Sequence, residues 1–284
     1  MNNQAYPWKV ILPLSFVIII DLIGLTIVFP IFAEIFSNHS PVFFSMQDSM
    51  IKKDLYFSLA ITIYPLMTLF GAPLLGDLSD SIGRKKVLLI CLSGSFSGLL
   101  LSGIAIQLHA FWLLLVGRAI AGFTAGSQQT AQAAIIDVSE KKNTTKNMAL
   151  IILSITVGMS IGPILGGVLV DHKLVHFFNN TTPFWVASLL SLINIAWLVF
   201  NFKETYQAEP KKLSLLRGIK SLPVGFKQKK LRALSCYFLL TQLGWIMYYQ
   251  VISFFLSKQF SYNALQSGFF MMYIALLLCF ALSY

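Results

Sequence analysis

The chain contains repeated apolar runs long enough to cross a membrane, and this feature constrains its fold more than any other. A helix needs about 20 predominantly apolar residues to cross the hydrocarbon core of a bilayer. Such runs cover approximately 9–36, 55–75, 87–108, 111–137, 148–170, 184–202 and 233–256, and an eighth extends from about 265 to Tyr284. Because lipid cannot satisfy backbone polar groups, these spans are predicted to be helices.

The composition excludes a soluble protein. Charged residues make up 11% of the chain, against roughly 25% in an ordinary globular domain, and mean hydropathy is +0.74. Membrane β-barrels consist of short strands that alternate apolar and polar residues, whereas these runs are long and uniformly apolar. The predicted class is therefore an all-α integral membrane protein.

Positive charge predicts the orientation. If successive spans cross the membrane in opposite directions, most of the 21 Lys and Arg residues lie in segments on the same side of the membrane as the N-terminus. The segments on the other side carry only Lys52, Lys53, Lys173 and Lys258. Because cationic loops stay on the cytoplasmic side, we expect a multi-pass protein of the inner (plasma) membrane with a cytoplasmic N-terminus. The net charge of +10 is then explained without nucleic acid.

The spans suggest three parts. Residues 1–202 are predicted to form a six-helix transmembrane bundle, and residues 203–232 a basic cytoplasmic linker. Residues 233–284 hold two more apolar runs, which we interpret as the start of a second, incomplete bundle.

Two ionisable residues lie well inside predicted spans. Asp21 is near the middle of the first span, nine residues before the helix-breaking Pro30. A mid-membrane Asp costs roughly 2.5–3.5 kcal/mol on insertion scales, so it either carries a proton or is held structurally by a neighbouring helix. Arg118 cannot shed its charge. It binds substrate, acts as a fixed counter-charge to Asp21, or extends to the membrane surface.

Polar residues also gather in the fourth span and recur in later ones. They line a substrate cavity or hydrogen-bond between helices; the candidates are Gln128, Gln129, Gln132, Asn194 and Gln242. Asp137 closes the fourth span on the predicted cytoplasmic side. It either forms an ion pair with Arg84 that locks that face or is a solvated helix end.

Two glycine-containing stretches stand out. Residues 76–86, GDLSDSIGRKK, combine two Asp with three cations, and we predict a short loop joining two antiparallel helices. The fifth span contains GMSIGPILGGV, whose special residues are Gly158, Gly162, Pro163, Gly166 and Gly167. Glycines at 158, 162 and 166 share one helix face and allow close backbone contact with a neighbouring helix.

Patterns of enzymes and of metal or nucleotide sites are lacking. The sequence has no GxxxxGK[ST] phosphate-binding loop, no G-x-S-x-G and no HExxH. Its three Cys lie inside apolar runs, and its four His lack metal-ligand spacing. We therefore expect no cofactor, no metal and no enzymatic activity.

Taken together, four stretches resemble the major facilitator superfamily. GDLSDSIGRKK is similar to the pattern G-x-x-x-D-x-x-G-R-[RK] of that superfamily's signature loop. DLIGLTIVFP, GRAIAGFTAG and GMSIGPILGGV resemble motifs of its drug/proton antiporter branch. The likeness is greatest to the tetracycline/proton antiporters, including the FKET that ends the sixth span.

The resemblance implies roles for the singled-out residues. Asp21 and Arg118 would take part in proton coupling, and the five residues of the fifth span would form the antiporter motif. A conformational switch would comprise Gly76, Asp80, Gly83, Arg84 and Asp137. The fold implied is a major facilitator helical bundle that works by alternating access.

One departure from the resemblance concerns the second half. The superfamily has twelve spans, whereas here the second half ends within its second span and lacks the repeat of the signature loop. The expected function is proton-coupled efflux of a drug-like amphipathic molecule, hence antibiotic resistance. The alternatives are a same-fold uptake transporter for a metabolite and a truncated fragment that does not transport.

Overall fold

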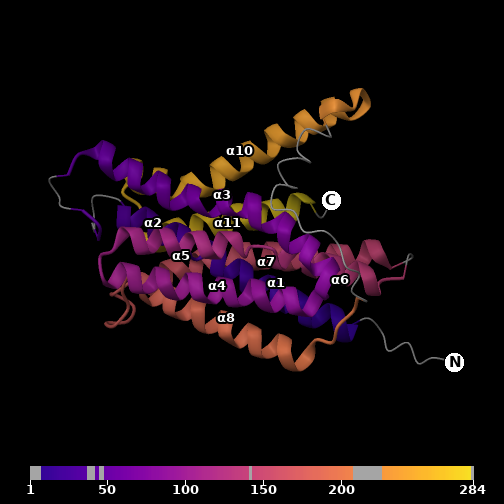
Figure 1. Cartoon of the computed structure of the whole chain (residues 1–284). Helices are drawn as coiled ribbons and strands as arrows, with labels where there is room; N and C mark the ends of the chain where they lie inside the picture. Colours follow the sequence, from indigo (N-terminus) through magenta and orange to yellow (C-terminus); the bar gives the residue numbers. More distant parts are fainter. Residues whose placement is uncertain (1–7, 37–41, 45–47, 141–142, 207–225, 283–284) are drawn as a thin grey trace.

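A computed structural model describes residues 8–36, 42–44, 48–140, 143–206 and 226–282. The described residues form a helical membrane-protein bundle, which confirms the predicted fold class (Figure 1). Most of the predicted linker, residues 207–225, lies outside the described residues, as do Lys141 and Lys142. The helices are α1 Trp8–Thr26, α2 Val28–Phe36, α3 Met50–Ile82, α4 Arg84–Gln107, α5 Phe111–Phe123, α6 Ser127–Val138, α7 Thr144–Val170, α8 Thr182–Asn201, α10 Lys229–Phe260 and α11 Ala264–Leu282.

The first predicted span is divided into α1 and α2 at Ile27. Pro30 has no backbone N–H, so it cannot donate to the carbonyl of Thr26, and its ring crowds that carbonyl. Within the last turn of α1, the Thr26 hydroxyl donates to Leu22 O at 2.8 Å. The predicted helix break therefore occurs one turn before the proline.

The fourth predicted span is also divided, which sequence reasoning did not predict. α5 ends at Phe123 and α6 begins at Ser127. The hydroxyl of Thr124 donates back to Ile120 O at 2.9 Å, an interaction that competes with regular helix geometry. The polar residues of α6 therefore follow a break that covers residues 124–126.

The prediction of a loop over residues 76–86 is wrong. α3 continues to Ile82, α4 begins at Arg84, and only Gly83 between them is not helical. Gly83 has φ +100°, a backbone conformation that glycine adopts without steric cost. The turn is therefore made by one residue, and the charged side chains project from helix ends.

Small residues let α7 pack closely against two neighbours. A Cβ atom on Gly162 would lie 2.0 Å from the Thr26 hydroxyl of α1, and one on Gly166 would lie 2.3 Å from Ile27 O. On Gly167 it would lie 2.6 Å from Ala264 O, at the start of α11. The expected glycine face is thus in contact with the α1–α2 segment, and Gly167 faces the second half.

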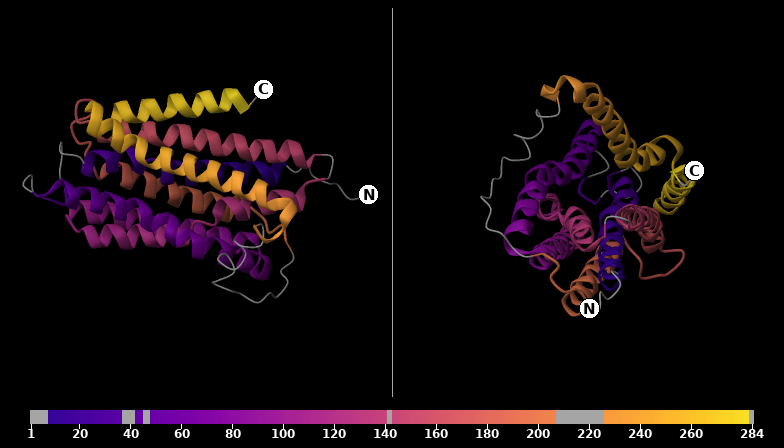
Figure 2. Two further views of the ribbon diagram at one scale, coloured as in Figure 1. Left: turned by 90° about the horizontal axis from the view of Figure 1, so that it is seen from above. Right: turned by 90° about the vertical axis from the view of Figure 1, so that its right-hand side faces the viewer.

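The helices of the second half, α10 and α11, lie together on one side of the bundle (Figure 2). α11 packs along α7, whereas α10 contacts α2. Toward its Lys229 end, α10 diverges from α3 (Figure 1). Among the described residues, the largest apolar cluster surrounds Phe32, Phe36 and Phe184; it lies mostly in the first half and includes Ala264 of α11.

Candidate functional site

Asp21 is held by two serines from different helices. Ser95 of α4 donates a hydrogen bond to Asp21 Oδ1 at 3.0 Å. Ser127, the first residue of α6, donates to Asp21 Oδ2. The break between α5 and α6 therefore brings a hydroxyl to this carboxyl group. Sequence reasoning singled out the glutamines that directly follow Ser127 but missed Ser95, whose signal is the serine-rich run SGSFS at residues 93–97.

Arg118 lies on α5 near Asp21 but does not pair with it. Its guanidinium carbon is 4.7 Å from the centre of the Tyr64 ring and 5.4 Å from that of Phe32. Both arginine and carboxyl group border a cavity of about 20 Å³, lined further by Gly24, Leu25, Tyr64, Ser95, Leu99 and Ala121. The cavity has room for roughly one water molecule.

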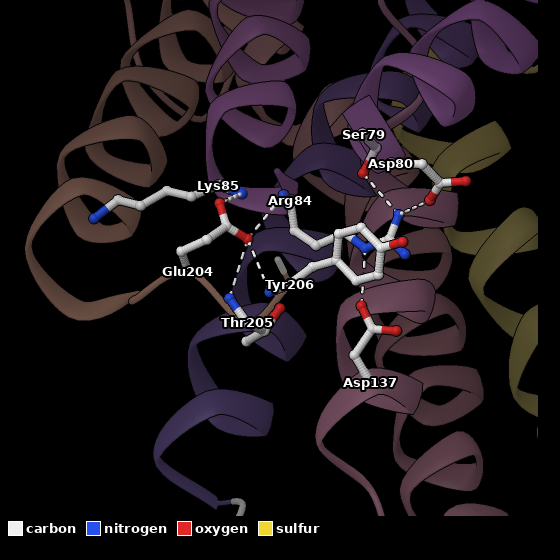
Figure 3. A network of polar contacts seen from close by, with 8 residues as sticks. All are labelled: Ser79, Asp80, Arg84, Lys85, Asp137, Glu204, Thr205 and Tyr206. Carbon is white, nitrogen blue, oxygen red and sulfur yellow. Dashed lines mark hydrogen bonds and ion pairs between the residues drawn. The ribbon is translucent and has the colours of Figure 1, made fainter. Parts of the chain in front are cut away.

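A cluster of charged groups surrounds Arg84 at the α3–α4 turn (Figure 3). Arg84 Nε lies 2.9 Å from Asp137 Oδ2, and Nη1 lies 2.8 Å from Asp80 Oδ1. Nη1 also donates to the Ser79 hydroxyl at 2.9 Å. The Arg84 side chain is only 8% exposed, so the α6 end is fixed to this turn through groups largely shielded from water.

Glu204 completes the cluster from the segment that follows α8, and sequence reasoning assigned it no role. Its carboxylate accepts hydrogen bonds from the backbone N–H groups of Arg84 and Lys85, at 2.9 and 3.0 Å. These are the first residues of α4, whose N–H groups have no partner within the helix. The Tyr206 ring lies 4.6 Å from the Arg84 guanidinium carbon.

Gly83 is required here for space as well as for its backbone angle. A Cβ atom at this position would lie 2.5 Å from Glu204 Oε2. The FKET stretch quoted for the family likeness therefore supplies a cap for α4. The only sequence signal for this contact was an acidic residue at the end of the sixth span.

The predicted cavity residues lie in different surroundings. Gln129 and Gln242 are exposed, and Gln128 and Gln132 are half-buried. Asn194 is fully buried and donates from Nδ2 to Val17 O at 3.2 Å, which joins α8 to α1. None of these five residues lines the cavity beside Asp21. Of the predicted switch residues, Gly76 has room for a side chain, because a Cβ atom added there would meet nothing within 4 Å.

A charged contact between the two halves lies at the opposite end of α3. Lys258 Nζ of α10 lies 3.0 Å from Asp54 Oδ2, with both side chains about half exposed. The rings of Phe57 and Phe254 stack beside this pair, with centres 3.9 Å apart. α10 is thus attached to α3 near its Phe260 end, while its other end diverges.

The sequence matches a known family over nearly its whole length. Residues 11–284 match the family described as Major Facilitator Superfamily. The chain is 27% identical over 252 residues to the class H tetracycline resistance protein of Pasteurella multocida, covering 85% of this chain and 59% of that protein. It is 26% identical over 189 residues to the class B protein of Escherichia coli, covering 66% of this chain and 42% of that protein.

Solved structures show the same fold. The crystal structure of the human organic anion transporter MFSD10 superposes with a TM-score of 0.69 at 20% identity, covering 97% of this chain and 70% of that one. The chain spans about half the length of the tetracycline resistance proteins that it matches.

Proposed function

This chain belongs to the major facilitator superfamily, and from that premise we propose that it mediates proton-coupled export of a drug-like amphipathic molecule by alternating access. Asp21 is the proton-carrying group in this proposal. The hinge groups around Arg84 are the conformational switch, and Gly158, Gly162, Pro163, Gly166 and Gly167 are the antiporter motif. The N-terminus and the α3–α4 turn face the cytoplasm, and the membrane is the inner (plasma) membrane.

The observation that carries the proposal is the position of Asp21. Its carboxyl group lies where three helices meet, bound by two hydroxyl groups and bordering a water-sized cavity. A hydroxyl group accepts as well as donates hydrogen bonds, so Ser95 and Ser127 can partner both the ionised and the protonated carboxyl. Such a site can exchange a proton without rearranging its helices.

Alternating access requires contacts that hold one end of the transporter closed. The Arg84 cluster and the Asp54–Lys258 contact lie at opposite ends of α3. The similarity to tetracycline resistance proteins supports export.

Drug accumulation in cells tests the proposal. Cells that express the chain should accumulate less of a fluorescent amphipathic drug than control cells, and a protonophore should abolish the difference. Asp21→Asn should abolish it too, because the amide cannot carry a proton. Asp171→Asn, at the half-buried residue that directly follows α7, is the matched control and should export normally. Protonophore-sensitive efflux that survives Asp21→Asn would remove Asp21 from the mechanism.

A further inference from the structure

Arg118 is a buried cation with an unsatisfied hydrogen-bond donor. The residue is 4% exposed, and among the described residues its Nε has no hydrogen-bond partner. The guanidinium lies against the rings of Tyr64 and Phe32, which attract a cation but accept hydrogen bonds only weakly. A buried donor without a partner is costly, so the site favours a small polar molecule beside Arg118.

The cavity beside Arg118 meets the requirements of a bound water molecule. It measures about 20 Å³, whereas one water needs at least about 10–15 Å³ and about two to four polar partners. Among the residues that line the cavity, four carry hydrogen-bonding groups, namely Asp21, Tyr64, Ser95 and Arg118. The cavity is far smaller than the pockets that hold drug-sized ligands, so its occupant is not the transported molecule.

Water fits this cavity better than a chloride ion, which is the other small partner that an arginine attracts. A chloride ion only accepts hydrogen bonds, and an ionised Asp21 at the same cavity repels it. A water molecule accepts a hydrogen bond from Arg118 and donates one to the carboxylate. The pairing of a cation with a carboxyl group around one cavity therefore favours a molecule that does both.

We propose that this cavity binds one water molecule, which bridges the Arg118 guanidinium to the Asp21 carboxyl group. The inference deepens the proposed function, and its functional part rests on Asp21 as the proton site. Arg118 is then a positioning residue, because it acts on Asp21 through the water. Ser95 and Ser127 already bind the two carboxyl oxygens, and the water adds a third partner that carries the influence of a fixed positive charge.

The bridging water serves both forms of Asp21. It donates a hydrogen bond to the ionised carboxylate, and it accepts one from the O–H group of the protonated form. Arg118 keeps its charge throughout, so through the water it stabilises the ionised form. Proton uptake therefore reorients the water and leaves the guanidinium in place.

Other titratable groups are neutral or lie toward helix ends. Tyr64 of α3 and Cys91 of α4 are near the pair, and both are neutral at physiological pH in their ordinary state. α8 carries no titratable side chain. The remaining titratable groups on the helices packed against α1 are Glu34 of α2, Arg84, Lys85 and Lys86 of α4, Asp137 of α6 and Lys146 of α7. Arg118 is therefore the cation that acts on Asp21 from close by.

A crystal structure of the purified full chain, at a resolution that shows ordered water, tests the site directly. We expect one density peak within hydrogen-bond distance, about 2.7–3.2 Å, of both Arg118 and an Asp21 oxygen. Crystals grown in bromide distinguish water from a halide, because bromide gives an anomalous signal. That signal in the cavity, the lack of a peak, or a direct ion pair between Arg118 and Asp21 would overturn the inference.

Gly24→Ala removes the water without changing either charged group. A Cβ atom at Gly24 would lie 3.2 Å from Leu99 Cδ1, and both residues line the cavity. The variant should lose the density peak. Protonated Asp21 has an infrared carbonyl band, and the pH at which half of this band has appeared should rise by about one to two units, because the carboxylate loses a hydrogen-bond donor.

Two arginine variants and a control assign the effect. Arg118→Gln should raise the same midpoint pH, because the fixed charge is gone, whereas Arg118→Lys should keep most of the wild-type value. Gly244→Ala is the matched control, because its added Cβ atom meets nothing within 4 Å, and it should keep both the peak and the midpoint. A midpoint that stays at the wild-type value in both Gly24→Ala and Arg118→Gln would overturn the positioning role.

The two proposals fail in different ways. If no carbonyl band belongs to Asp21, the proposed function fails, while the density peak still tests the water site. If Asp21 titrates but the cavity shows no water, this inference alone is refuted. If Gly24→Ala does not fold, the wild-type peak and the two Arg118 variants still decide.

Discussion

The ion pair between Arg84 and Asp137 should couple the α3–α4 turn to the end of α6 by a measurable free energy. Arg84 Nε lies 2.9 Å from Asp137 Oδ2, and the two side chains are 8% and 22% exposed. Fully exposed ion pairs contribute about 0–1 kcal/mol, whereas hydrogen bonds to charged groups contribute about 1.5–3 kcal/mol. Shielding from water places this pair in the second class, so Asp137→Asn should lower the free energy of unfolding by about 2 kcal/mol.

The effect of removing the arginine should be larger. Arg84 also binds Asp80 and Ser79, so Arg84→Gln breaks more hydrogen bonds and leaves two carboxylates facing each other. Once Arg84 is absent, replacing Asp137 by Asn removes part of that repulsion. The double variant should therefore be less destabilised than the sum of the single variants, by about 1–2 kcal/mol.

Denaturant unfolding in detergent micelles measures the free energies of unfolding of the wild type, the two single variants and the double variant. Fluorescence and circular dichroism must give the same transition. Asp171→Asn serves as the control, because its carboxylate caps an exposed turn. Additivity of the two substitutions within about 0.5 kcal/mol would refute the reasoning and reduce the cluster to independent surface charges.

Three other stability predictions follow from single contacts. Gly162→Ala should lower the free energy of unfolding by about 1–3 kcal/mol, because the added methyl group overpacks against α1. Gly76→Ala should raise it by about 0.5–1 kcal/mol, because the added methyl group meets nothing within 4 Å. If thermal unfolding ranks the two variants in the opposite order, the packing described here is wrong. Glu204→Ala should cost about 0.5–2 kcal/mol, as loss of a helix cap does, and should speed amide hydrogen exchange in the first turn of α4; unchanged exchange would show that the cap is dispensable. Lys258→Gln should lower the free energy of unfolding by at most about 1 kcal/mol, because the ion pair with Asp54 is half exposed. High salt should remove this difference from wild type. A loss of stability that does not depend on salt would show that Lys258 acts through packing.

Much of the fold could be predicted because apolar length acts over whole segments. The helical class and most span positions follow from that length, and the break near Pro30 follows from the missing backbone N–H of proline. The division of the fourth span could not be predicted from hydropathy, since the break lies within one apolar run, beside the Thr124 hydroxyl bond to Ile120 O and the close approach of Gly122 to Tyr64 O. The supposed loop at residues 76–86 was misjudged because charged residues at helix ends resemble loop residues in composition.

The site was predictable where a residue type is costly in lipid. Asp21 and Arg118 stand out in any apolar run, and Arg84 and Asp137 stand out at its ends. Ser95 was not identifiable, because placing a serine in a membrane helix costs little free energy. Its role depends on its hydrogen bond to Asp21, which the sequence does not reveal. Glu204 was overlooked because its partners are backbone N–H groups, which leave no trace in the sequence.

The central claim is that Asp21 takes up and releases a proton within the folded bundle. Infrared difference spectroscopy of the purified chain between acidic and alkaline pH measures this directly, because a protonated carboxyl group has a carbonyl band that an ionised one lacks. The account predicts that one component of the reversible wild-type carbonyl band is lost in Asp21→Asn and kept in Asp171→Asn, while the other Asp and Glu residues contribute equally in all three proteins. A carbonyl band unchanged by Asp21→Asn would contradict the account.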